Sequence, residues 1–591
     1  MLKKIVSLSL CLIMLLGVFA SCAKKDENDK GPYIAMYLTD QIYDFDPAHA
    51  YGNEAALRVV SLLFDNLFVL NENGKVKKSL AKDYEYIAND NVKEYKMTID
   101  INETCWSDGI SVSANDVVYA WKRILDVANS FESAALLYDI KNARAAKEGE
   151  CSIDDVCIYS AGERRLEIFF EGPIDPDQFL YKLTSHALAP LREDIVRATA
   201  VEDDWAKKPS VFVASGPFRL REVSYDSESA GLTLERNSYY YRNIEKDDID
   251  EAVTPFRIMV DYTMTPEQIK AAFEAGEIFY VGDIPMELRG AWKDKADVKD
   301  AMSTHTYYLN ENAEINGEKL FAIPEVRRAL SLAIDRQAIA NDVVFAKAAT
   351  GLIPYEVFNT SRKNSFREEG GNLITTSANL TAAQAELAKA NITPSNYKFA
   401  ISVPAYDDLH IKIAEAVQKA WTALGFEVEL DKIELIDNKD FLLSTNEALD
   451  GVKDDIFAQN VRAGKYQVAA VDYVAFTPDA YSMLAPFAKG FTGGAASKEF
   501  SIKFEIPTHI TGYHNDAYDA KIAEAYAKKD DAEAYASLLH EAEELLLNDM
   551  PVIPIIFNQT ATMTHKDLSK ISYTYYGTAI FTKTKQKNYL E

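Results

Sequence analysis

One stretch in the second half of the chain alternates between strand and helix periodicity, and it constrains the fold more than any other feature. Every second residue is apolar on both sides of a helical segment, at Phe399, Ile401 and Val403 and again at Phe426, Val428 and Leu430. The segment between them carries apolar residues at helical spacing and ends at Gly425, with Leu409, Ile413, Val417, Ala420, Trp421 and Leu424 on one face. A strand, a helix and a strand in this order predict a β-α-β unit with parallel strands. The sequence therefore favours an α/β body.

Start and stop signals for helices recur elsewhere. Ser113 and Asp116 form a pattern typical of a capping box, and a helix is expected to follow. Thr265 to Gln268 combines a cap with a proline at the first helical position, and Gly276 is a stop signal. Near the end of the chain, a long amphipathic helix is expected to run into a short buried strand over the letters MPVIPIIF.

Composition and charge exclude several classes of protein. The chain has 591 residues, of which 48% are hydrophobic and 11% aromatic, too many for an intrinsically disordered chain. Its 63 basic and 91 acidic side chains give a net charge of −28, which argues against a nucleic-acid-binding surface. No run of about 20 apolar residues follows the first 30 residues, so the body is not expected to span a membrane.

The first residues have the pattern of a signal peptide. Two lysines precede an uncharged run from Ile5 to Phe19, and the small residues Ala20 and Ser21 stand before Cys22. The segment resembles the lipobox of bacterial lipoproteins, although Phe19 stands where that motif usually has Leu. The alternative is a plain secretory signal that leaves Cys22 as a free thiol. We expect an extracytoplasmic protein anchored to the bacterial cell membrane through a lipid on Cys22 alone, with residues 22–31 as a flexible tether.

The three cysteines of the folded body are too few for a disulfide framework. Cys151 and Cys157 could close a small disulfide loop, or could remain unpaired thiols. Neither they nor Cys105 form a zinc-binding pattern.

The sequence contains none of the common catalytic signatures. The serine hydrolase elbow, the zinc protease motif, the phosphate-binding loop and the dinucleotide-binding turn are all missing. The eight histidines are scattered, so no metal site and no cofactor are predicted. A secreted hydrolase would need a nucleophile or metal constellation, and a purely structural lipoprotein would show no response to a ligand. Both remain as alternative functions.

Four segments, in this order, resemble those of one protein family. They are CWSDGISVSANDVVYAWKRILD (Cys105 to Asp126), SGPFRLREV with LERNSYYYR (Ser215 to Arg242), IPEVRRALSLAIDRQAI (Ile323 to Ile339) and the helix and strand from Asp531 to Phe557. The chain is similar to the family 5 extracellular solute-binding proteins, the oligopeptide- and dipeptide-binding lipoproteins of peptide ABC importers. We interpret these segments as architectural. Asp108 and Gly109 read as a turn, and Arg327, Arg328 and Asp335 to Arg336 are expected on the solvent side of their helices.

The resemblance implies an α/β, bilobal periplasmic-binding-protein-like fold (type II, cluster C) with an additional domain. The chain would divide into a signal peptide (1–21), a tether (22–31), lobe I in three parts (32–66, 196–304 and 556–591), the additional domain (67–195) and lobe III with insertions (305–555). Residues 437–464 and 486–507 are read as inserted loops. Hinge closure of the lobes would enclose the ligand.

The resemblance also implies a function. The protein would capture a solute, most simply an oligopeptide, and deliver it to the permease subunits of an ABC importer as a monomer without catalysis. The ligand would lie extended in the cleft and bond to the backbone of both lobes. The residues expected to contact it are Gln41, Ile42, Tyr43, Tyr307, Tyr308, Asp472, Tyr473, Val474, Phe476, Phe557 and Asn558. For the aromatic residues, ordinary core packing is the alternative.

One departure from the family pattern concerns the ligand's amino group. Peptide-binding relatives hold it with an aspartate four residues before a proline, and that position is Val474 here. A buried ammonium without a carboxylate partner is costly. Asp472 or Asp479 could replace the aspartate if the register shifts. Otherwise the ligand would be N-blocked, longer, or a different solute such as a nickel chelate or a sugar.

Overall fold

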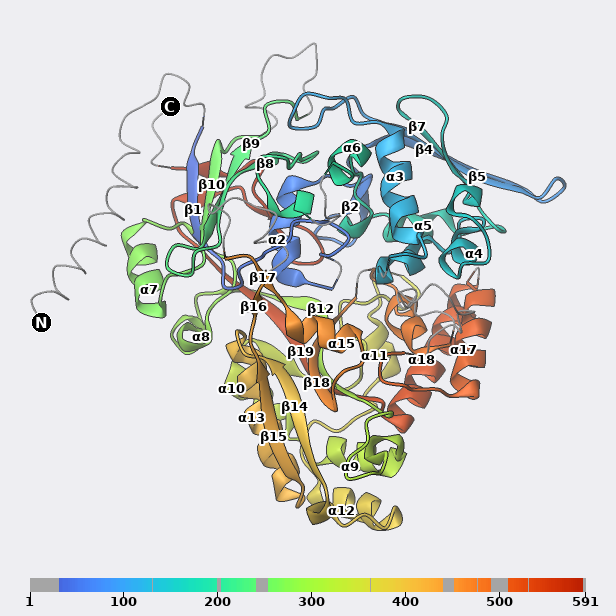
Figure 1. Cartoon of the computed structure of the whole chain (residues 1–591), viewed down its shortest axis with the longest axis vertical. Helices are drawn as coiled ribbons and strands as arrows, with labels where there is room; N and C mark the ends of the chain where they lie inside the picture. Colours follow the sequence, from blue (N-terminus) through green and yellow to red (C-terminus); the bar gives the residue numbers. More distant parts are fainter. Residues whose placement is uncertain are drawn as a thin grey trace, which may run out of the picture.

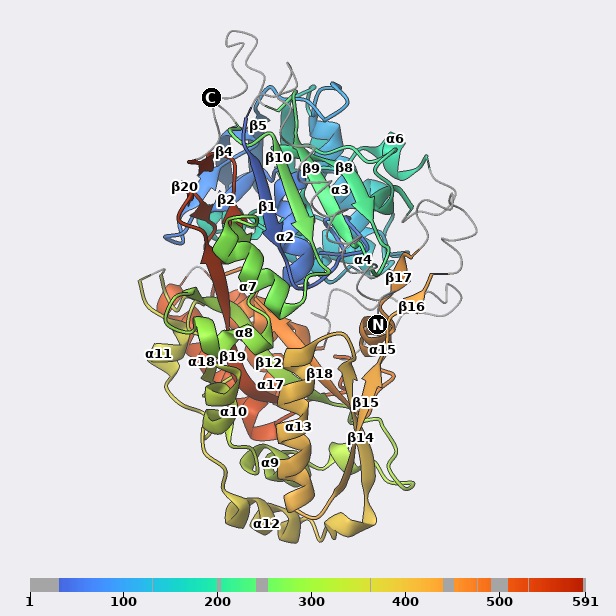
Figure 2. The same ribbon diagram turned by 90° about the vertical axis from the view of Figure 1, so that its left-hand side faces the viewer.

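The chain folds into two lobes, one above the other in the views of Figures 1 and 2. The computed structural model describes residues 31–587, except for positions 51, 130, 199–203, 241–252, 362, 439–450, 476, 490–508 and 530. The predicted signal peptide, Cys22 and Phe476 lie outside the described residues. No helix within the described ranges combines the length and the apolar character needed to cross a bilayer.

A large sheet passes through both lobes. Among the described residues it has 11 strands, of which β13 (Ala346–Ala348) pairs only with β19. The other strands follow the order β15 (Glu427–Ile433), β14 (Lys398–Pro404), β18 (Val468–Val474), β12 (Asp297–Leu309), β19 (Val552–Thr564), β11 (Tyr280–Val281), β1 (Tyr33–Tyr37), β10 (Arg257–Asp261), β9 (Gly231–Arg236) and β8 (Phe218–Ser224). The predicted β-α-β unit is confirmed, since β14 and β15 are parallel and α13 (Asp408–Ala423) connects them.

Two long antiparallel strands, β12 and β19, connect the lobes. Residues 297–300 of β12 pair with 559–562 of β19 on the upper side, and residues 304–308 pair with 552–557 on the lower side. The register shifts between these two halves, so residues 301–303 have no partner on β19. Such irregularities bend strands and weaken the ladder locally. The interruption therefore lies at the junction between the two lobes, where the pairing of the two connecting strands is weakest.

The upper lobe contains one end of the large sheet, from β11 to β8, and a separate antiparallel sheet. α2 (Glu54–Leu63) contacts β8 of the large sheet. The second sheet has the order β4 (Ala81–Asn89), β5 (Glu94–Ile101), β7 (Arg165–Phe169) and β6 (Ile158–Ser160), and α3 (Ala114–Leu125) packs against its β6 and β7. The shorter elements of this region are β2 (Phe68–Leu70), β3 (Val76–Lys78), α4 (Ala143–Lys147), α5 (Pro176–Lys182), α6 (Glu193–Val196), α7 (Pro266–Ala275) and α8 (Met286–Trp292).

The lower lobe packs its helices around β12, β14, β18 and β19 and has a hydrophobic core of its own. Its helices are α9 (Pro324–Leu332), α10 (Arg336–Val343), α11 (Phe366–Gly370), α12 (Leu380–Lys389), α13, α15 (Ile456–Arg462), α16 (Tyr481–Leu484), α17 (Asp516–Ala527) and α18 (Ala532–Asp549). Residues 568–586 return to the upper lobe, where β20 (Leu568–Ser569) pairs with β23 (Lys585–Gln586) and the hairpin of β21 (Ser572–Tyr573) and β22 (Ala579–Ile580) lies between them in sequence. The domain boundaries given by the resemblance stay predictions.

Local signals in the sequence determine where helices begin. Asp116 accepts hydrogen bonds from the backbone N–H of Ser113 (2.8 Å) and the indole of Trp106 (3.1 Å), which fixes the start of α3. In the preceding turn, the N–H of Ile110 donates to Asp108, and Gly109 has a φ of 90° that favours glycine. The capping box at Thr265 and the stop at Gly276 of α7 are also confirmed.

Two arginines depart from the expectation. Arg327 and Arg336, expected on the solvent side, are 2% and 0% exposed, so the prediction was wrong. Arg336 donates to the carbonyl oxygens of Ser331, Thr375 and Pro554, and burial without a carboxylate partner lowers its pKa to about 9. Both arginines donate to backbone carbonyl groups inside the lobe, a role that helical periodicity does not reveal.

Two further expectations were resolved. Residues 437–464 are not a plain loop, because they contain β17 (Lys453–Asp454), which pairs with β16 (Ile436–Asp437), and α15. Cys151 and Cys157 are unbridged thiols whose sulfurs approach the carbonyl oxygens of Asn142 and Asp155.

Candidate functional site

A pocket lies between the lobes, beside the interrupted part of the β12–β19 ladder. It encloses about 640 Å³, part of it open to solvent. The upper lobe contributes Glu54, Leu57, Arg58, Thr184, Ser185, His186, Thr560, Tyr576, Gly577 and Thr578, and the lower side contributes Met302, Val474 and Ala475. Because both lobes form its walls, opening of the lobes would take the pocket apart.

Glu54 is the carboxylate of this pocket. It stands in the first turn of α2, and Ser303 donates a hydrogen bond to its Oε1 at 2.8 Å. Ser303 in turn accepts from the side chain of Asn558 at 3.1 Å, so the unpaired stretch of β12 links Glu54 to β19. Burial raises the pKa of Glu54, and the attraction of Arg58 opposes this shift. His186, also in the pocket, has its pKa lowered to about 4 by burial and is neutral at pH 7.

Negative charge accumulates around the pocket. Arg58 lies 3.2 Å from Asp283 and 3.9 Å from Asp40, both of the upper lobe. Burial, followed by repulsion from Asp407 of the lower lobe, raises the pKa of Asp40 to about 7. With Glu54 and Asp472, five carboxylates interact across this region. Such an excess favours a cationic group in the cleft.

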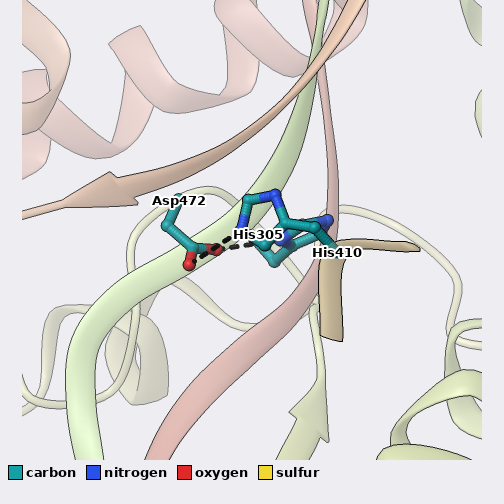
Figure 3. A group of neighbouring side chains, drawn as sticks. All are labelled: His305, His410 and Asp472. Atoms are coloured by element: carbon teal, nitrogen blue, oxygen red, sulfur yellow. Dashed lines mark hydrogen bonds and ion pairs between the residues drawn. The ribbon is translucent and has the colours of Figure 1, made fainter. Parts of the chain in front are cut away.

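Two histidines and an aspartate converge on the lower side of the cleft (Figure 3). His305 on β12 stands opposite Asp472 on β18, and its Nδ1 lies 2.8 Å from Asp472 Oδ1. His410 in the first turn of α13 places Nε2 3.2 Å from the other oxygen, Oδ2. Burial alone would lower the pKa of His410, but Asp407 and Asp472 outweigh it and raise the pKa to about 9. The pKa of Asp472 lies well below the ordinary range because the two histidines outweigh its burial.

The structure places the predicted ligand contacts in different surroundings. Val474 lines the pocket, and Asp472 keeps 34% of its side chain exposed. The rings of Tyr307, Tyr308 and Phe557 lie inside the lower lobe, each at most 4% exposed.

The remaining candidates lie outside the pocket lining. The Tyr43 hydroxyl donates to Gln41, and the Tyr43 ring stacks on Tyr225, while Ile42 is buried. The hydroxyl of Tyr473 donates to the carbonyl of Met483. Asp479 accepts hydrogen bonds from the Tyr535 hydroxyl and the backbone N–H of Tyr481, so its carboxylate is engaged within the lower lobe.

The sequence did not indicate Glu54, Arg58, His305 or His410 as site residues. No motif surrounds them, and His410 lies 62 residues from Asp472 in sequence. The one available signal was the position of Glu54, which directly follows the helix cap Asn53.

A second contact between the lobes is centred on Asp139. Its carboxylate accepts hydrogen bonds from Lys182 of α5 and from Tyr526 and Lys529 at the end of α17 in the lower lobe. Figure 1 shows α17 below α4 and α5. Burial alone would raise the pKa of Asp139, but the two lysines and the hydrogen bonds outweigh it and hold the pKa far below the ordinary value.

We expect Asp139→Asn to lower the free energy of unfolding at pH 7 by about 1–2 kcal/mol, because it removes the charge that two lysines share. A depressed carboxylate pKa stabilises the fold above the unfolded-state value of about 3.9, and that gain is lost as pH falls toward the folded-state pKa. Urea denaturation should therefore show the difference from wild type shrinking between about pH 4 and pH 3. A difference that stays constant over this range would contradict the assignment.

Comparison with known proteins places the chain in a family. The sequence model of the bacterial extracellular solute-binding proteins, family 5 Middle, matches residues 75–495. The chain belongs to this family. The family 5 chain is 28% identical over 523 residues to the dipeptide-binding protein DppE of Bacillus subtilis, covering 87% of this chain and 84% of DppE. The oligopeptide-binding protein OppA of the same organism is 26% identical over 514 residues, covering 84% and 83%.

Solved structures show the same fold. The pheromone receptor PrgZ, whose structure describes its mode of peptide binding, superimposes with a TM-score of 0.76 at 22% identity, covering 94% of this chain and 99% of PrgZ. The bilobal α/β fold predicted from the sequence is therefore confirmed.

Proposed function

We propose that this protein is the extracytoplasmic solute-binding component of an ABC importer, which captures a peptide between its lobes and delivers it to the permease subunits without chemical change. The observation that carries the proposal is the pocket walled by both lobes at the interrupted β12–β19 ladder. A ligand there stabilises the closed arrangement by contacting both lobes at once. The names of DppE and OppA as dipeptide- and oligopeptide-binding proteins support peptide as the solute.

The peptide is proposed to lie extended between residues 41–43 of the upper lobe and residues 472–474 of the lower lobe, bonding to their backbones. Its amino group is assigned to Glu54. This carboxylate shares the pocket with Val474, the position where peptide-binding relatives carry an aspartate. Both oxygens of Asp472 already face histidines, whereas within the described part of the chain Glu54 accepts a side-chain hydrogen bond at Oε1 alone. Burial disfavours the charged form of Glu54, and an ammonium group next to the carboxylate would stabilise that form.

The protein is further proposed to work as a monomer held at the bacterial membrane by a lipid on Cys22. The small residues before Cys22 and the polar stretch after it support this. Mass spectrometry of the mature N-terminal peptide checks it: acyl chains on Cys22 are expected, and an unmodified Cys22 thiol would contradict anchoring.

Native mass spectrometry of the purified protein tests the cargo. Enclosed solutes copurify with such proteins, and we expect adducts with the masses of peptides, which unfolding releases. Calorimetry with a mixed tripeptide library, in buffer containing EDTA, should then show saturable binding. Adducts with the mass of a sugar or a metal chelate, with no response to peptides, would assign a different solute class. Saturable turnover of ester or peptide substrates would favour an enzyme instead.

A further inference from the structure

The lower side of the cleft brings together donor atoms from three separate elements. β12 and β18 hold His305 and Asp472 in register on neighbouring strands. α13 supplies His410 from its first turn, and the cap residue of this helix, Asp407, accepts a hydrogen bond from the His410 N–H at 3.0 Å. Because strand pairing and a helix cap fix these backbones, the side chains start from a preorganised arrangement.

The donor set suits a divalent transition metal. One ring nitrogen of His305, one of His410 and a carboxylate oxygen of Asp472 all lie within 4.8 Å of one another. Donors around a tetrahedral zinc ion, with bonds of about 2.0–2.2 Å, are separated by roughly 3.3 Å, so small side-chain movements suffice. Asp407 adds a second carboxylate, with Oδ2 3.6 Å from His410 Nε2. Imidazole and carboxylate together are a common ligand set of Zn²⁺, Ni²⁺ and Co²⁺.

The histidines of this group are buried and the aspartates are partly exposed, as an accessible metal site requires. His305 and His410 are 0% and 5% exposed, whereas the side chains of Asp472 and Asp407 are 34% and 29% exposed. An ion can therefore reach the imidazoles past the two carboxylates. The negative charge of neighbouring Asp40 and Glu54 adds to the attraction for a dication.

We propose that His305, His410 and Asp472, with Asp407, form a binding site for a divalent transition metal at the wall of the cleft, where a coordination position stays open toward the bound solute. The site is independent of the peptide assignment. It differs from the second group of possible ligands, His514, Asp516 and Asp519, whose side chains are 46%, 97% and 20% exposed on the surface.

Calorimetric titration of the EDTA-stripped, desalted full chain with ZnCl₂ tests the proposal. One site per chain is expected, and Co²⁺ should give the strong visible absorption of a four-coordinate site. His410→Ala should weaken Zn²⁺ binding by at least about 100-fold, since loss of a supporting contact alone costs about 10–100-fold. His514→Ala, the matched control, should leave it within about twofold of wild type.

Asp472→Asn preserves the size of the side chain and should also weaken Zn²⁺ binding strongly. It provides the same test if His410→Ala fails to fold. The proposal is overturned if the wild type takes up no Zn²⁺ at micromolar concentrations, or if binding survives His410→Ala and Asp472→Asn but is lost in His514→Ala. Peptide titrations in EDTA are a separate readout, so failure of the metal site and failure of the peptide assignment are distinguishable.

Discussion

Replacing Glu54 with glutamine should weaken binding of a peptide with a free amino terminus by about 10- to 100-fold, equivalent to about 1.5–3 kcal/mol. Glutamine keeps the size of the side chain and can still accept the hydrogen bond from Ser303, but it lacks the charge that an enclosed ammonium needs. Isothermal titration calorimetry with matched free and N-acetylated peptides measures the effect. The acetylated peptide should bind both proteins equally.

The matched control is Glu267→Gln, since Glu267 also stands in the first turn of a helix, α7, but is exposed and does not line the pocket. It should leave both affinities unchanged. If Glu54→Gln and Glu267→Gln behave alike with both peptides, Glu54 does not hold the amino group.

The same contact should depend on pH. Because burial raises the pKa of Glu54, despite the opposing attraction of Arg58 and the hydrogen bond from Ser303, the carboxylate is neutralised at a higher pH than an exposed glutamate. A neutral Glu54 attracts an ammonium less, so affinity for the free peptide should fall as pH falls through that raised pKa. The nearby acids Asp283 and Asp472 also face this region and contribute to the profile. The part of this pH dependence that comes from Glu54 should be absent in Glu54→Gln, so comparison of the two proteins measures it.

Glu543→Gln should lower the free energy of unfolding by about 3–5 kcal/mol. Glu543 on α18 is 0% exposed, and its Oε1 accepts hydrogen bonds from Arg367 (2.6 Å) and from the backbone N–H groups of Leu352 (2.9 Å) and Ile353 (3.0 Å). Glutamine would leave the guanidinium of Arg367, itself 1% exposed, as an unpaired charge inside the lower lobe. Gly351 adjoins the pair, because a Cβ there would lie only 1.8 Å from Arg367 Nη1.

Thermal and urea denaturation measure this loss. Glu541→Gln is the control on the same helix, since its side chain is 53% exposed and pairs with Lys521 at the surface, so less than about 1 kcal/mol should be lost. The double change Glu543→Gln with Arg367→Met should recover most of the stability, because the guanidinium charge leaves while the glutamine oxygen still accepts from the backbone N–H groups of Leu352 and Ile353. If Glu543→Gln and Glu541→Gln lower the free energy of unfolding equally, the buried Glu543–Arg367 pair contributes no more to stability than a surface pair.

Local features of the fold could be predicted from the sequence. The capping groups of α3 and α7 and the apolar periodicity of β14, α13 and β15 involve neighbours a few residues apart, so the printed sequence contains all the information needed. Buried arginines show the limit. Arg336 lies on the polar side of its helix by periodicity, yet the carbonyl of Pro554, more than 200 residues away, accepts from it.

The site could be predicted only in part. The segment 472–474 came from the resemblance, and Val474 does line the pocket. The pairing of His305 with Asp472 depends on the register of two strands 167 residues apart, and Glu54 enters through the helix on the opposite lobe. Side chains that are brought together by contacts between distant segments produce no recognisable local sequence pattern.

The position of β19 has a consequence for biosynthesis. This strand lies in the middle of the large sheet, between β12 and β11, yet it is translated after every other strand of that sheet. Until then, β12 and β11 each present an open edge, which invites pairing with other chains. A nascent chain that stops before Val552 would therefore hold two incomplete half-sheets, each with an exposed edge strand.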